Sequence, residues 1–562
     1  MTIPNIAVDW GKKLQRVGGL VWLPPLLFLL GFYLFPLFSI FRLSAGQVVS
    51  GSIDQAAWTR VGRALSFTFW QAGLSTLLTL LLGLPAAWIF SHFHFPGKNL
   101  FRALTTLPFI LPTVVAAAGF NALLGPRGWV NLSLMSFFDL TAPPVQVLNT
   151  LWAILLAHVF YNTTVIVRLV GAAWVQIDPR INQAARVLGA SPLRAFWSVT
   201  LPLLKPSILA ASLLVFLFDF SSFGVVLLLG GPRFATLEVE IFIQALQMLN
   251  LPLAGLLSAI QLLCTLVMME IYLRLSKGVD VPLIPRLRGE GTRKPRSLRE
   301  WLAVGAVLVT LSGLMIAPIG ALTFRSFVRL EPDRGQRGEV QTGFTLDYYK
   351  ELFQNRQQTL FYVAPGRAAI NSLVYAAATV LFSLPLGFMA AYALNKRSRF
   401  SRWLDGLIML PLGTSAVTLG LGFVVTFSRI SDSLFLVPLA HSLVALPMIV
   451  RTLLPAVSSI PPSLRQAAAV LGANPFNVWL KVDLPILKRT VTASAIFAFT
   501  ISLGEFGATT FLARPEMPTL PVAIYRYLSQ PGGLNYGQAL AMATILMVIC
   551  ALSIFVIDRL QA

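Results

Sequence analysis

Long apolar segments separated by short polar segments run along almost the whole 562-residue chain. A helix of about 20 apolar residues is long enough to cross the ~30 Å hydrocarbon core of a membrane. Twelve segments reach that length, near residues 20–41, 65–90, 104–124, 148–176, 205–230, 252–275, 301–324, 371–395, 404–427, 432–456, 490–513 and 536–558. The pattern predicts an all-α polytopic membrane protein with about 12 transmembrane helices. The first apolar run is too long for a typical signal peptide, so we expect an uncleaved span.

The positions of the basic residues predict the orientation of these spans. If the N-terminus is cytosolic, alternate loops are cytosolic too, and those loops carry Lys98, Arg102, Arg180, Arg186, Arg194, Lys396, Arg397, Arg399 and Arg402. This distribution follows the positive-inside rule, so we expect both termini in the cytosol. The formal net charge of +21 could suggest nucleic acid. Because the basic residues lie between apolar spans, we instead expect contact with membrane lipid and none with nucleic acid.

A polar motif occurs twice, 283 residues apart. From Gln183 it reads Gln-Ala-Ala-Arg-Val-Leu-Gly-Ala-Ser-Pro, and from Gln466 it reads Gln-Ala-Ala-Ala-Val-Leu-Gly-Ala-Asn-Pro. Each copy predicts a short helix that ends in a left-handed turn at glycine. A second helix should follow, with Ser or Asn as its N-cap and proline at its first position. A Leu-Pro pair follows in each copy, and we expect it to end the second helix.

The duplication extends well beyond this motif. At the same separation, His158 matches His441, Arg168 matches Arg451, Phe223 matches Phe506 and Gly224 matches Gly507. We therefore predict two tandem homologous six-helix halves, 1–275 and 301–562, with polar loops at 178–202 and 461–485. Two copies in the same orientation imply a pseudo-twofold axis along the membrane normal.

Three connecting segments complete this organisation. The basic segment 276–300 is expected to be a cytosolic linker between the halves, although contact with anionic lipid is an alternative. An excess of residues between 121 and 157 predicts an external loop in the first half. In the polar stretch 325–370, the aromatic run at 344–353 predicts an external helix.

The repeated motif resembles the "EAA" loop of the membrane subunits of type I ABC importers, the binding-protein-dependent permeases. The pattern there is Glu-Ala-Ala, three residues, Gly, nine residues and Ile-x-Leu-Pro. The corresponding residues here are Gln183, Ala184, Ala185, Gly189, Leu201 and Pro202, and in the second copy Gln466, Ala467, Ala468, Gly472, Leu484 and Pro485. Both copies depart from the pattern at Gln183 and Gln466, which replace glutamate, and at Val199 and Val482, which replace isoleucine.

The resemblance implies a type I ABC importer permease fold in the bacterial plasma (inner) membrane. In that family the loops are coupling helices, so it implies docking on two copies of a separate cytosolic ABC ATPase subunit. It also implies an extracytoplasmic solute-binding protein that delivers the cargo. Because one chain contains both halves, it is similar to the fused permeases of the ferric-iron and thiamine import systems.

The sequence contains no recognisable catalytic constellation. Gly97 and Lys98 lack the preceding glycine of a phosphate-binding Gly-x-x-x-x-Gly-Lys-Ser/Thr loop. We therefore expect a transport subunit and not an enzyme, with no metal site and no cofactor in this chain. The resemblance implies that ATP and Mg²⁺ bind to the partner subunits. The two cysteines, Cys264 and Cys550, lie in apolar segments and are expected to be inert.

Two carboxylates are predicted to lie at membrane depth, where ionisable groups are costly and face protein or water. Asp219 aligns with Ser502, and Glu505 aligns with Ser222. We hypothesise that these four positions line the translocation path and that the carboxylates favour a cationic cargo. The alternative is that each carboxylate is buried and hydrogen-bonded to nearby Ser or backbone groups.

The matched basic side chains in spans four and ten have structural interpretations as well as functional ones. His158 and His441 could relay protons, or they could form hydrogen bonds between helices. Arg168 and Arg451 are expected near the cytosolic ends of their spans, where they extend towards water or brace the polar loops.

We therefore interpret the chain as the permease subunit of an ATP-driven, binding-protein-dependent importer. It would form the path for a small, cationic solute of the ferric-iron or thiamine type. The first alternative is an ion-driven secondary transporter with duplicated halves. The second is a membrane-embedded enzyme or an assembly scaffold. The sequence does not identify the cargo, because sulfate-type and polyamine-type permeases share much of the same pattern.

Overall fold

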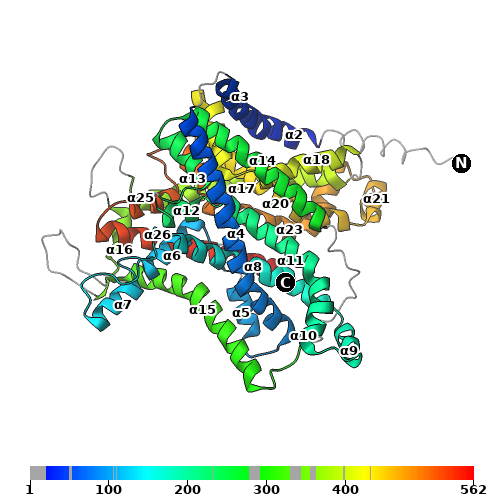
Figure 1. Ribbon diagram of the computed structural model, residues 1–562. Coiled ribbons are helices and arrows are strands. Elements are labelled where there is room, and N and C mark those ends of the chain that lie inside the picture. The colour runs from blue at the N-terminus through cyan, green and yellow to red at the C-terminus, as the bar shows by residue number, and fades with distance from the viewer. Residues whose placement is uncertain are drawn as a thin grey trace.

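The computed structural model describes residues 21–49, 54–105, 107–108, 111–231, 233–276, 292–329, 343–354, 363–395, 399–430 and 432–561. Most of the predicted 276–300 linker, the basic residues Lys396 and Arg397, and both chain ends lie outside these residues. The described part is almost entirely helical, as Figure 1 shows.

The helices of the first half are α2 (Leu23–Leu29), η1 (Leu30–Leu34), α3 (Phe35–Val49), α4 (Gln55–His92), α5 (Lys98–Leu104), α6 (Thr113–Leu124), α7 (Trp129–Phe138), α8 (Leu151–Gln176), α9 (Pro179–Val187), α10 (Pro192–Ala195), η3 (Phe196–Thr200), α11 (Leu201–Phe220), α12 (Gly224–Leu229), α13 (Leu237–Phe242), η4 (Ile243–Gln247) and α14 (Leu251–Ser276). Of these, η1, η3 and η4 are π-helical turns.

The elements of the second half are α15 (Leu298–Phe327), β1 (Val328–Arg329), β2 (Gly343–Phe344), α16 (Asp347–Lys350), η6 (Glu351–Phe353), α17 (Pro365–Asn395), α18 (Arg399–Met409), η7 (Leu410–Gly413), α19 (Ala416–Thr426), η8 (Ser428–Ile430), α20 (Leu436–Ser459), α21 (Pro462–Val470), α22 (Pro475–Val478), η9 (Trp479–Asp483), α23 (Leu484–Gly504), α24 (Gly507–Leu512), α25 (Leu520–Leu528) and α26 (Gly533–Gln561). The short strands β1 and β2 pair antiparallel, and η9 is a π-helical turn.

The predicted all-α polytopic fold with about 12 transmembrane helices is confirmed, and the third predicted span of each half is interrupted. In the described residues ten helices are long and apolar enough to cross a membrane, or eleven if the bent pair Arg399–Gly413 and Ala416–Thr426 counts as one. The predicted span 404–427 is this pair, which bends by 99°. The predicted span 104–124 is divided between α5 and the 12-residue α6, which begins after Pro112. Proline restricts the residue before it and cannot donate a backbone hydrogen bond, so the first run breaks at Pro112. In the second run Pro411 lies in the 3-10 turn η7, directly before the bend.

Two segments predicted to be external differ in local structure from what was expected. The helix expected at 344–353 is present only as α16 and η6, because Phe344 pairs with Val328 in the strand pair β1–β2. In the first half, the predicted external loop at 121–157 contains helix α7.

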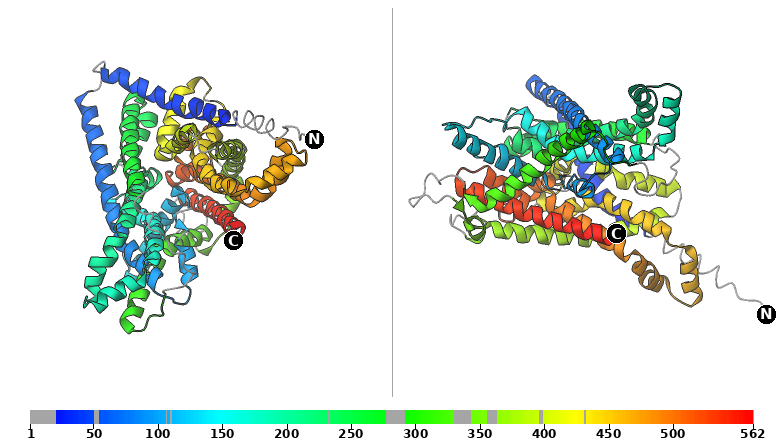
Figure 2. Two further views of the ribbon diagram at one scale, coloured as in Figure 1. Left: turned by 90° about the vertical axis from the view of Figure 1, so that its right-hand side faces the viewer. Right: turned by 90° about the horizontal axis from the view of Figure 1, so that it is seen from below.

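The first helix of each half packs on the opposite half. Helix α3 contacts α19 of the second half, and α15 contacts α6 of the first half (Figures 1 and 2). A glycine allows each close approach. A Cβ atom on Gly119 of α6 would lie 2.9 Å from the backbone oxygen of Pro318, and one on Gly422 of α19 would lie 3.0 Å from Cβ of Pro36. Small residues that let helix backbones approach are a common means of association in membranes.

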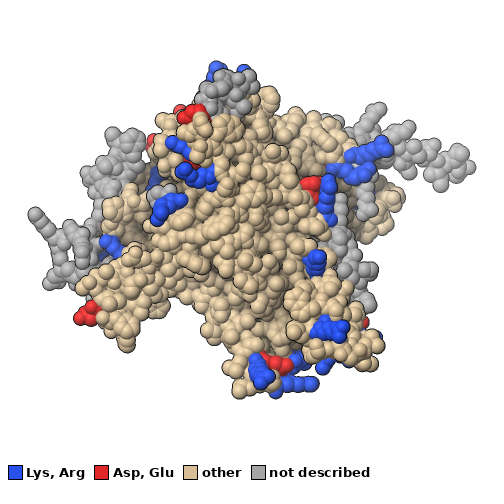
Figure 3. Space-filling model, in the orientation of Figure 1, with Lys and Arg blue, Asp and Glu red and all other residues tan. Residues whose placement is uncertain are grey.

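The surface agrees with a membrane environment. Figure 3 shows a broad uncharged area, with Lys, Arg, Asp and Glu mostly towards its edges. Many large apolar side chains are exposed to the surroundings, including Leu81, Trp152, Leu263 and Val309. In water such an area would be unfavourable, whereas in a bilayer it faces lipid.

We predict that Gly119→Val loosens the contact between the halves. The added side chain meets the rigid backbone of Pro318, so the folded state should lose about 1–3 kcal/mol by overpacking. The loss can be measured as the midpoint temperature at which the protein in mild detergent stops eluting as a single species. Gly313→Val is the control, because a Cβ on that residue of α15 has nothing within 4 Å. Equal midpoints for the two variants would contradict the prediction.

Candidate functional site

A cavity of about 380 Å³ lies between the two halves. The first half contributes Leu111, Thr113, His158, Tyr161, Asn162, Phe218, Asp219, Ser221, Ser222, Phe223, Gly224, Val225 and Glu238. The second half contributes Ser415, Ala416, Val417, Gly504, Glu505, Phe506 and Gly507. A cavity of this size at a boundary between two units is typical of a small-molecule site.

Matching breaks in two long helices form the centre of the cavity. The helix through α11 ends at Phe220 and resumes as α12 at Gly224, and the helix through α23 ends at Gly504 and resumes as α24 at Gly507. The broken segments place Phe223 and Phe506 face to face, with ring centroids 5.4 Å apart and planes 23° apart. Because these residues occupy equivalent positions in the two halves, their contact marks the predicted pseudo-twofold axis.

Asp219 is held by side chains of α8. Its Oδ1 accepts a hydrogen bond from Asn162 Nδ2 at 2.6 Å and lies 3.3 Å from Nδ1 of His158. The side chain is fully buried, and its Oδ2 has no hydrogen-bond partner among the described residues. Ser222, also in the predicted set, lies 2.8 Å from Nε2 of the same histidine.

Glu505 has a different environment, because it caps helix α24. Its two oxygens accept from the backbone N–H groups of Ala508 and Thr509 at 2.8 and 2.9 Å. Oε2 also accepts from the Thr509 hydroxyl at 2.6 Å and lies 3.1 Å from Nε2 of His441. Glu505 thus borders the cavity and is buried and bonded to backbone groups, as the alternative predicted, whereas its place in a translocation path stays a prediction.

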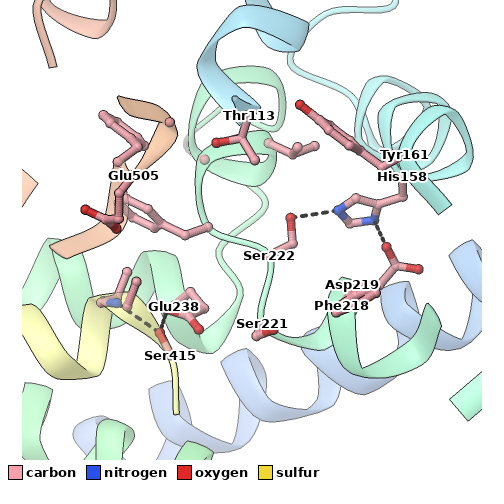
Figure 4. Close-up of a pocket in the computed structure, with 18 of the residues that line it drawn as sticks. Thr113, His158, Tyr161, Phe218, Asp219, Ser221, Ser222, Glu238, Ser415 and Glu505 are labelled. Atoms are coloured by element: carbon pink, nitrogen blue, oxygen red, sulfur yellow. Dashed lines mark hydrogen bonds and ion pairs between the residues drawn. The ribbon is translucent and has the colours of Figure 1, made fainter. Parts of the chain in front are cut away.

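His158 and His441 occupy equivalent positions, but each contacts its carboxylate through a different ring nitrogen. In the first half, Nδ1 of His158 faces Asp219 and Nε2 faces Ser222, as Figure 4 shows. In the second half, Nδ1 of His441 lies 2.7 Å from Ser502, which is equivalent to Asp219, and Nε2 faces Glu505.

Each histidine therefore contacts one carboxylate, and both of its nitrogens also meet hydroxyl groups. The Ser75 hydroxyl lies 2.9 Å from Nδ1 of His158, and the Thr509 hydroxyl lies 2.8 Å from Nε2 of His441. The interhelical hydrogen bonding predicted for these histidines is confirmed; a proton relay stays a prediction.

A third carboxylate, Glu238 of α13, was missed by the sequence analysis. It is fully buried, accepts a hydrogen bond from the Ser415 hydroxyl of the other half at 2.5 Å and is also bonded by Gln261 (Figure 4). Glu238 falls between two predicted spans, whereas Asp219 and Glu505 lie within predicted spans. One feature of the sequence could have indicated that Glu238 is buried. It stands in the apolar run from Leu237 to Phe242, and this run forms helix α13 in the interior of the protein.

The two polar loops have the predicted local structure. Helices α9 and α21 end before Gly189 and Gly472, whose φ angles of 88° and 83° are left-handed. Ser191 and Asn474 then cap the next helices through hydrogen bonds from the N–H groups of Arg194 at 3.3 Å and Asn477 at 2.7 Å. Figure 1 shows α9 and α21 at the same side of the molecule, well separated from each other.

The prediction that each Leu-Pro pair ends a helix is wrong. Single helical runs, Pro192–Phe220 and Pro475–Gly504, continue through Pro202 and Pro485. The π-helical turns η3 and η9 lie immediately before these Leu-Pro pairs. Because a π turn is wider than an α turn, it accommodates a proline ring that would clash with the carbonyl four residues earlier.

The loops expose apolar side chains at equivalent positions. Val187, Leu188, Val470 and Leu471 are each 87% exposed. Gln183, Ala184, Gln466 and Ala467 are exposed beside them, whereas Ala185 and Ala468 are half-buried. Apolar groups this exposed on a polar loop indicate a surface that another protein covers.

The structure also describes Arg451 and the two cysteines that the sequence analysis singled out. Arg451 Nη2 lies 3.4 Å from the Asp405 carboxylate, so it braces α20 against α18. Cys264 and Cys550 are free thiols. Within the part of the chain that the structure describes, no group of three or more His, Cys, Asp or Glu side chains is arranged to hold a metal ion.

Comparison with known proteins gives matches over most of the chain. A family model described as binding-protein-dependent transport system inner membrane component matches residues 79–281 and 383–562. The chain is 28% identical over 528 residues to the thiamine transport system permease protein ThiP of Brucella suis biovar 1 (strain 1330), covering 91% of this chain and 90% of that protein. It is 28% identical over 512 residues to ThiP of Escherichia coli (strain K12), covering 88% of each chain. The sulfate transport system permease protein CysT of Synechococcus elongatus is 29% identical over 202 residues, 36% of this chain and 69% of that protein.

The exchanged carboxylates predict opposite tautomers for the two histidines. Because an ionised carboxylate only accepts hydrogen bonds, the proton of His441 should lie on Nε2, and that of His158 should lie on Nδ1, shared between Asp219 at 3.3 Å and the Ser75 hydroxyl at 2.9 Å. The measurement is ¹⁵N NMR of histidine-labelled protein, with the four histidines assigned through His158→Gln and His441→Gln variants. The same tautomer at both residues would contradict the assignment.

Proposed function

The chain belongs to the family of binding-protein-dependent transport system inner membrane components, and we propose that the cavity between its halves carries a small organic cation of the thiamine type across the membrane. The two regions matched by the family model lie one in each half, so the chain is a fused two-half permease subunit of a binding-protein-dependent importer. It is a multi-pass inner-membrane protein.

The lining of the cavity is the observation that carries the cargo proposal. Three carboxylates border it, those of Asp219, Glu238 and Glu505, and none of the described lining residues is Lys or Arg. Carboxylates in a site with apolar walls focus a negative potential that attracts cations. An anion such as sulfate would meet like charges there, which disfavours it.

The aromatic rings of the cavity favour an organic cation over ferric iron. Tyr161, Phe218, Phe223 and Phe506 all contribute to its lining. Aromatic faces bind organic cations through their quadrupoles, whereas small, highly charged metal ions prefer oxygen ligands. Thiamine carries a positively charged thiazolium ring, and relatives that match about nine-tenths of this chain are thiamine permeases by name.

Two copies of a cytosolic ABC ATPase subunit are proposed to dock on the loops at 178–202 and 461–485. The exposed pairs Val187–Leu188 and Val470–Leu471 supply apolar contacts at equivalent places. ATP and Mg²⁺ would bind to those subunits, and an extracytoplasmic binding protein would deliver the cargo to the opposite side. This arrangement places both chain termini in the cytosol. Binding of ATP moves the permease only if it favours one arrangement of the halves over the other.

We predict that Glu238→Gln lowers thiamine uptake by about tenfold at limiting concentration, because one charge of the cavity is removed. Uptake of radiolabelled thiamine is measured in cells that lack their own thiamine importer and express the chain with its ATPase and binding protein. Glu240→Gln is the matched control, since Glu240 is on the same helix, bonds to Gln244 and does not line the cavity. Asp219→Asn and Glu505→Gln should also lower uptake. If Glu238→Gln and Glu240→Gln transport equally well, the cargo proposal fails.

We predict that the double variant Gly189→Val and Gly472→Val uncouples ATP hydrolysis from transport. A β-branched residue in a left-handed conformation costs about 1–3 kcal/mol, so both loops should change shape. Uptake should be lost while the co-purified ATPase still hydrolyses ATP. Ala190→Val is the control in the same loop, because Ala190 does not have a positive φ. Normal uptake by the double variant would overturn the role of the loops.

A further inference from the structure

The two loops have the same backbone form but are anchored to the membrane helices by different chemistry. In the first loop, the hydroxyl of Thr200 donates a hydrogen bond to Asn182 Oδ1 at 3.1 Å. The equivalent residues of the second loop are Arg465 and Asp483, 283 positions further on. Arg465 Nε donates to both oxygens of Asp483, at 2.9 and 3.1 Å. A neutral hydrogen bond in the first half is therefore an ion pair in the second.

A third side chain extends the anchor of the second loop. The hydroxyl of Tyr392, in α17, donates to Asp483 Oδ2 at 2.6 Å, and the Arg465 guanidinium lies 5.5 Å from the centre of the Tyr392 ring. Asp483 thus joins three elements, namely α17, α21 and η9. The first loop has no counterpart of this hydroxyl, as the alignment of α4 with α17 establishes.

The alignment of these two helices follows from a shared contact. The N–H of Leu237 donates to Thr68, and the N–H of the equivalent Leu520 donates to Ser372. Thr68 therefore corresponds to Ser372, and Trp88 corresponds to Tyr392. The Trp88 ring packs edge-on against Phe93 with centroids 5.2 Å apart. In the described residues, only the second half has the Tyr-Asp-Arg arrangement.

The Arg465–Asp483 ion pair and the Thr200–Asn182 hydrogen bond differ in how much free energy is lost when one partner is removed. Asp483 is only 3% exposed, and removal of one partner of a buried charge pair leaves a costly uncompensated charge. A neutral hydrogen bond contributes less, and its loss is correspondingly mild.

Aromatic rings pack both loops on membrane helices, Phe196 on Trp174 in the first and Trp479 on Phe388 in the second. The difference lies between the loop helix and the segment after it, where the second loop has a buried ion pair that reaches α17 and the first has a neutral hydrogen bond.

The exposed surfaces of the two loops also differ in charge, and here the first loop has more charged groups than the second. The first loop exposes Arg180, Arg186 and Arg194, where the second has Ser463, Ala469 and Asn477. The first loop thus has more exposed positive charges that a partner protein could contact. The second loop has more polar contacts with its own membrane helices.

We propose that the two loops have unequal roles, with the second transmitting ATPase movement to the membrane helices through the Arg465–Asp483–Tyr392 anchor. Asp483 is then a positioning residue, since it acts by holding α21 rigidly against α17 and the helix that leads to Glu505. The inference rests on the docking of an ATPase on both loops, as set out under the proposed function.

The test exchanges the anchors between the halves. The double variant Arg465→Asn and Asp483→Thr gives the second loop the pair that the first loop already uses. Thr200→Val removes the hydrogen bond of the first loop and preserves the shape of the side chain. Tyr392→Phe removes only the hydroxyl and serves as a milder variant of the second anchor. Each is made in a Cys264→Ala, Cys550→Ala background that carries one new cysteine, Val417→Cys, in the cavity lining.

Three measurements separate assembly from transmission. The first is the amount of ATPase that co-purifies with the tagged chain, and the second is its rate of ATP hydrolysis. The third is the change in maleimide labelling of the cavity cysteine on addition of ATP, which does not depend on the identity of the cargo. The exchanged second anchor should leave the first two unchanged and reduce the ATP-driven change in labelling by about tenfold. Thr200→Val should reduce it by about threefold at most, and Tyr392→Phe should fall between the two.

Each other result has a definite meaning. Equal losses for the exchanged second anchor and for Thr200→Val, with the ATPase still bound, would overturn the unequal roles and leave docking intact. The unequal roles would also be overturned, with docking intact, if the double variant Arg465→Asn and Asp483→Thr kept the full ATP-driven change in maleimide labelling. If no ATPase co-purifies with the unaltered chain, docking itself fails, and the inference fails with it.

Discussion

The breaks in two transmembrane helices at the centre of the protein determine most of what surrounds them. Away from water, each backbone N–H exposed at a break must find a partner within the protein. In the second half, Glu505 accepts from the first N–H groups of α24, and Ser415 accepts from those of α19. The polar groups that line the cavity are therefore the same groups that allow helices to end inside a membrane protein.

These capping groups differ between the halves, although the backbone is repeated. Ser415 caps α19, while the equivalent helix α6 begins after Pro112, which has no side-chain hydrogen bond to offer. Glu238 crosses to Ser415, whereas the residue equivalent to it is Pro521. Within the described residues, the Glu238–Ser415 contact between the halves thus has no counterpart on the other side of the pseudo-twofold axis. Fusion into one chain makes this possible, because each half can change without imposing the same change on its counterpart.

The sequence predicted turns and helix caps correctly at positions that only one or a few residue types can occupy. Gly189 and Gly472 take the left-handed turn, and the residues that follow cap the next helix, because few side chains can serve at those positions. At residues 104–124 and 404–427 hydropathy did not show that the helix is interrupted, because it averages over a window and does not register a break between two short helices. The Leu-Pro prediction was wrong because a π turn relieves the clash on which the rule depends.

The cavity itself depends on contacts that no local pattern contains. Asp219 and Glu505 were found from their own neighbourhoods, but the exchange of their histidine contacts requires α8 and α20 to be in place. Glu238 was missed because it belongs to a short segment that returns into the interior between two spans. Such a segment has too few residues to reach the length expected of a span, so its burial follows only from the tertiary packing.

The continuous helices provide a direct mechanical connection between the loops and the cavity. The run Pro192–Phe220 has 29 residues, which corresponds to roughly 40 Å at ~1.5 Å per residue. It begins beside Gly189 and ends at Asp219, and the run Pro475–Gly504 likewise leads from Gly472 to Glu505. Each of these hydrogen-bonded helices therefore joins a loop to the break where Phe223 meets Phe506. Because Phe223 follows the end of one run and Phe506 follows the end of the other, the stacked rings are the contact at which a shift of one helix relative to the other would reach the cavity.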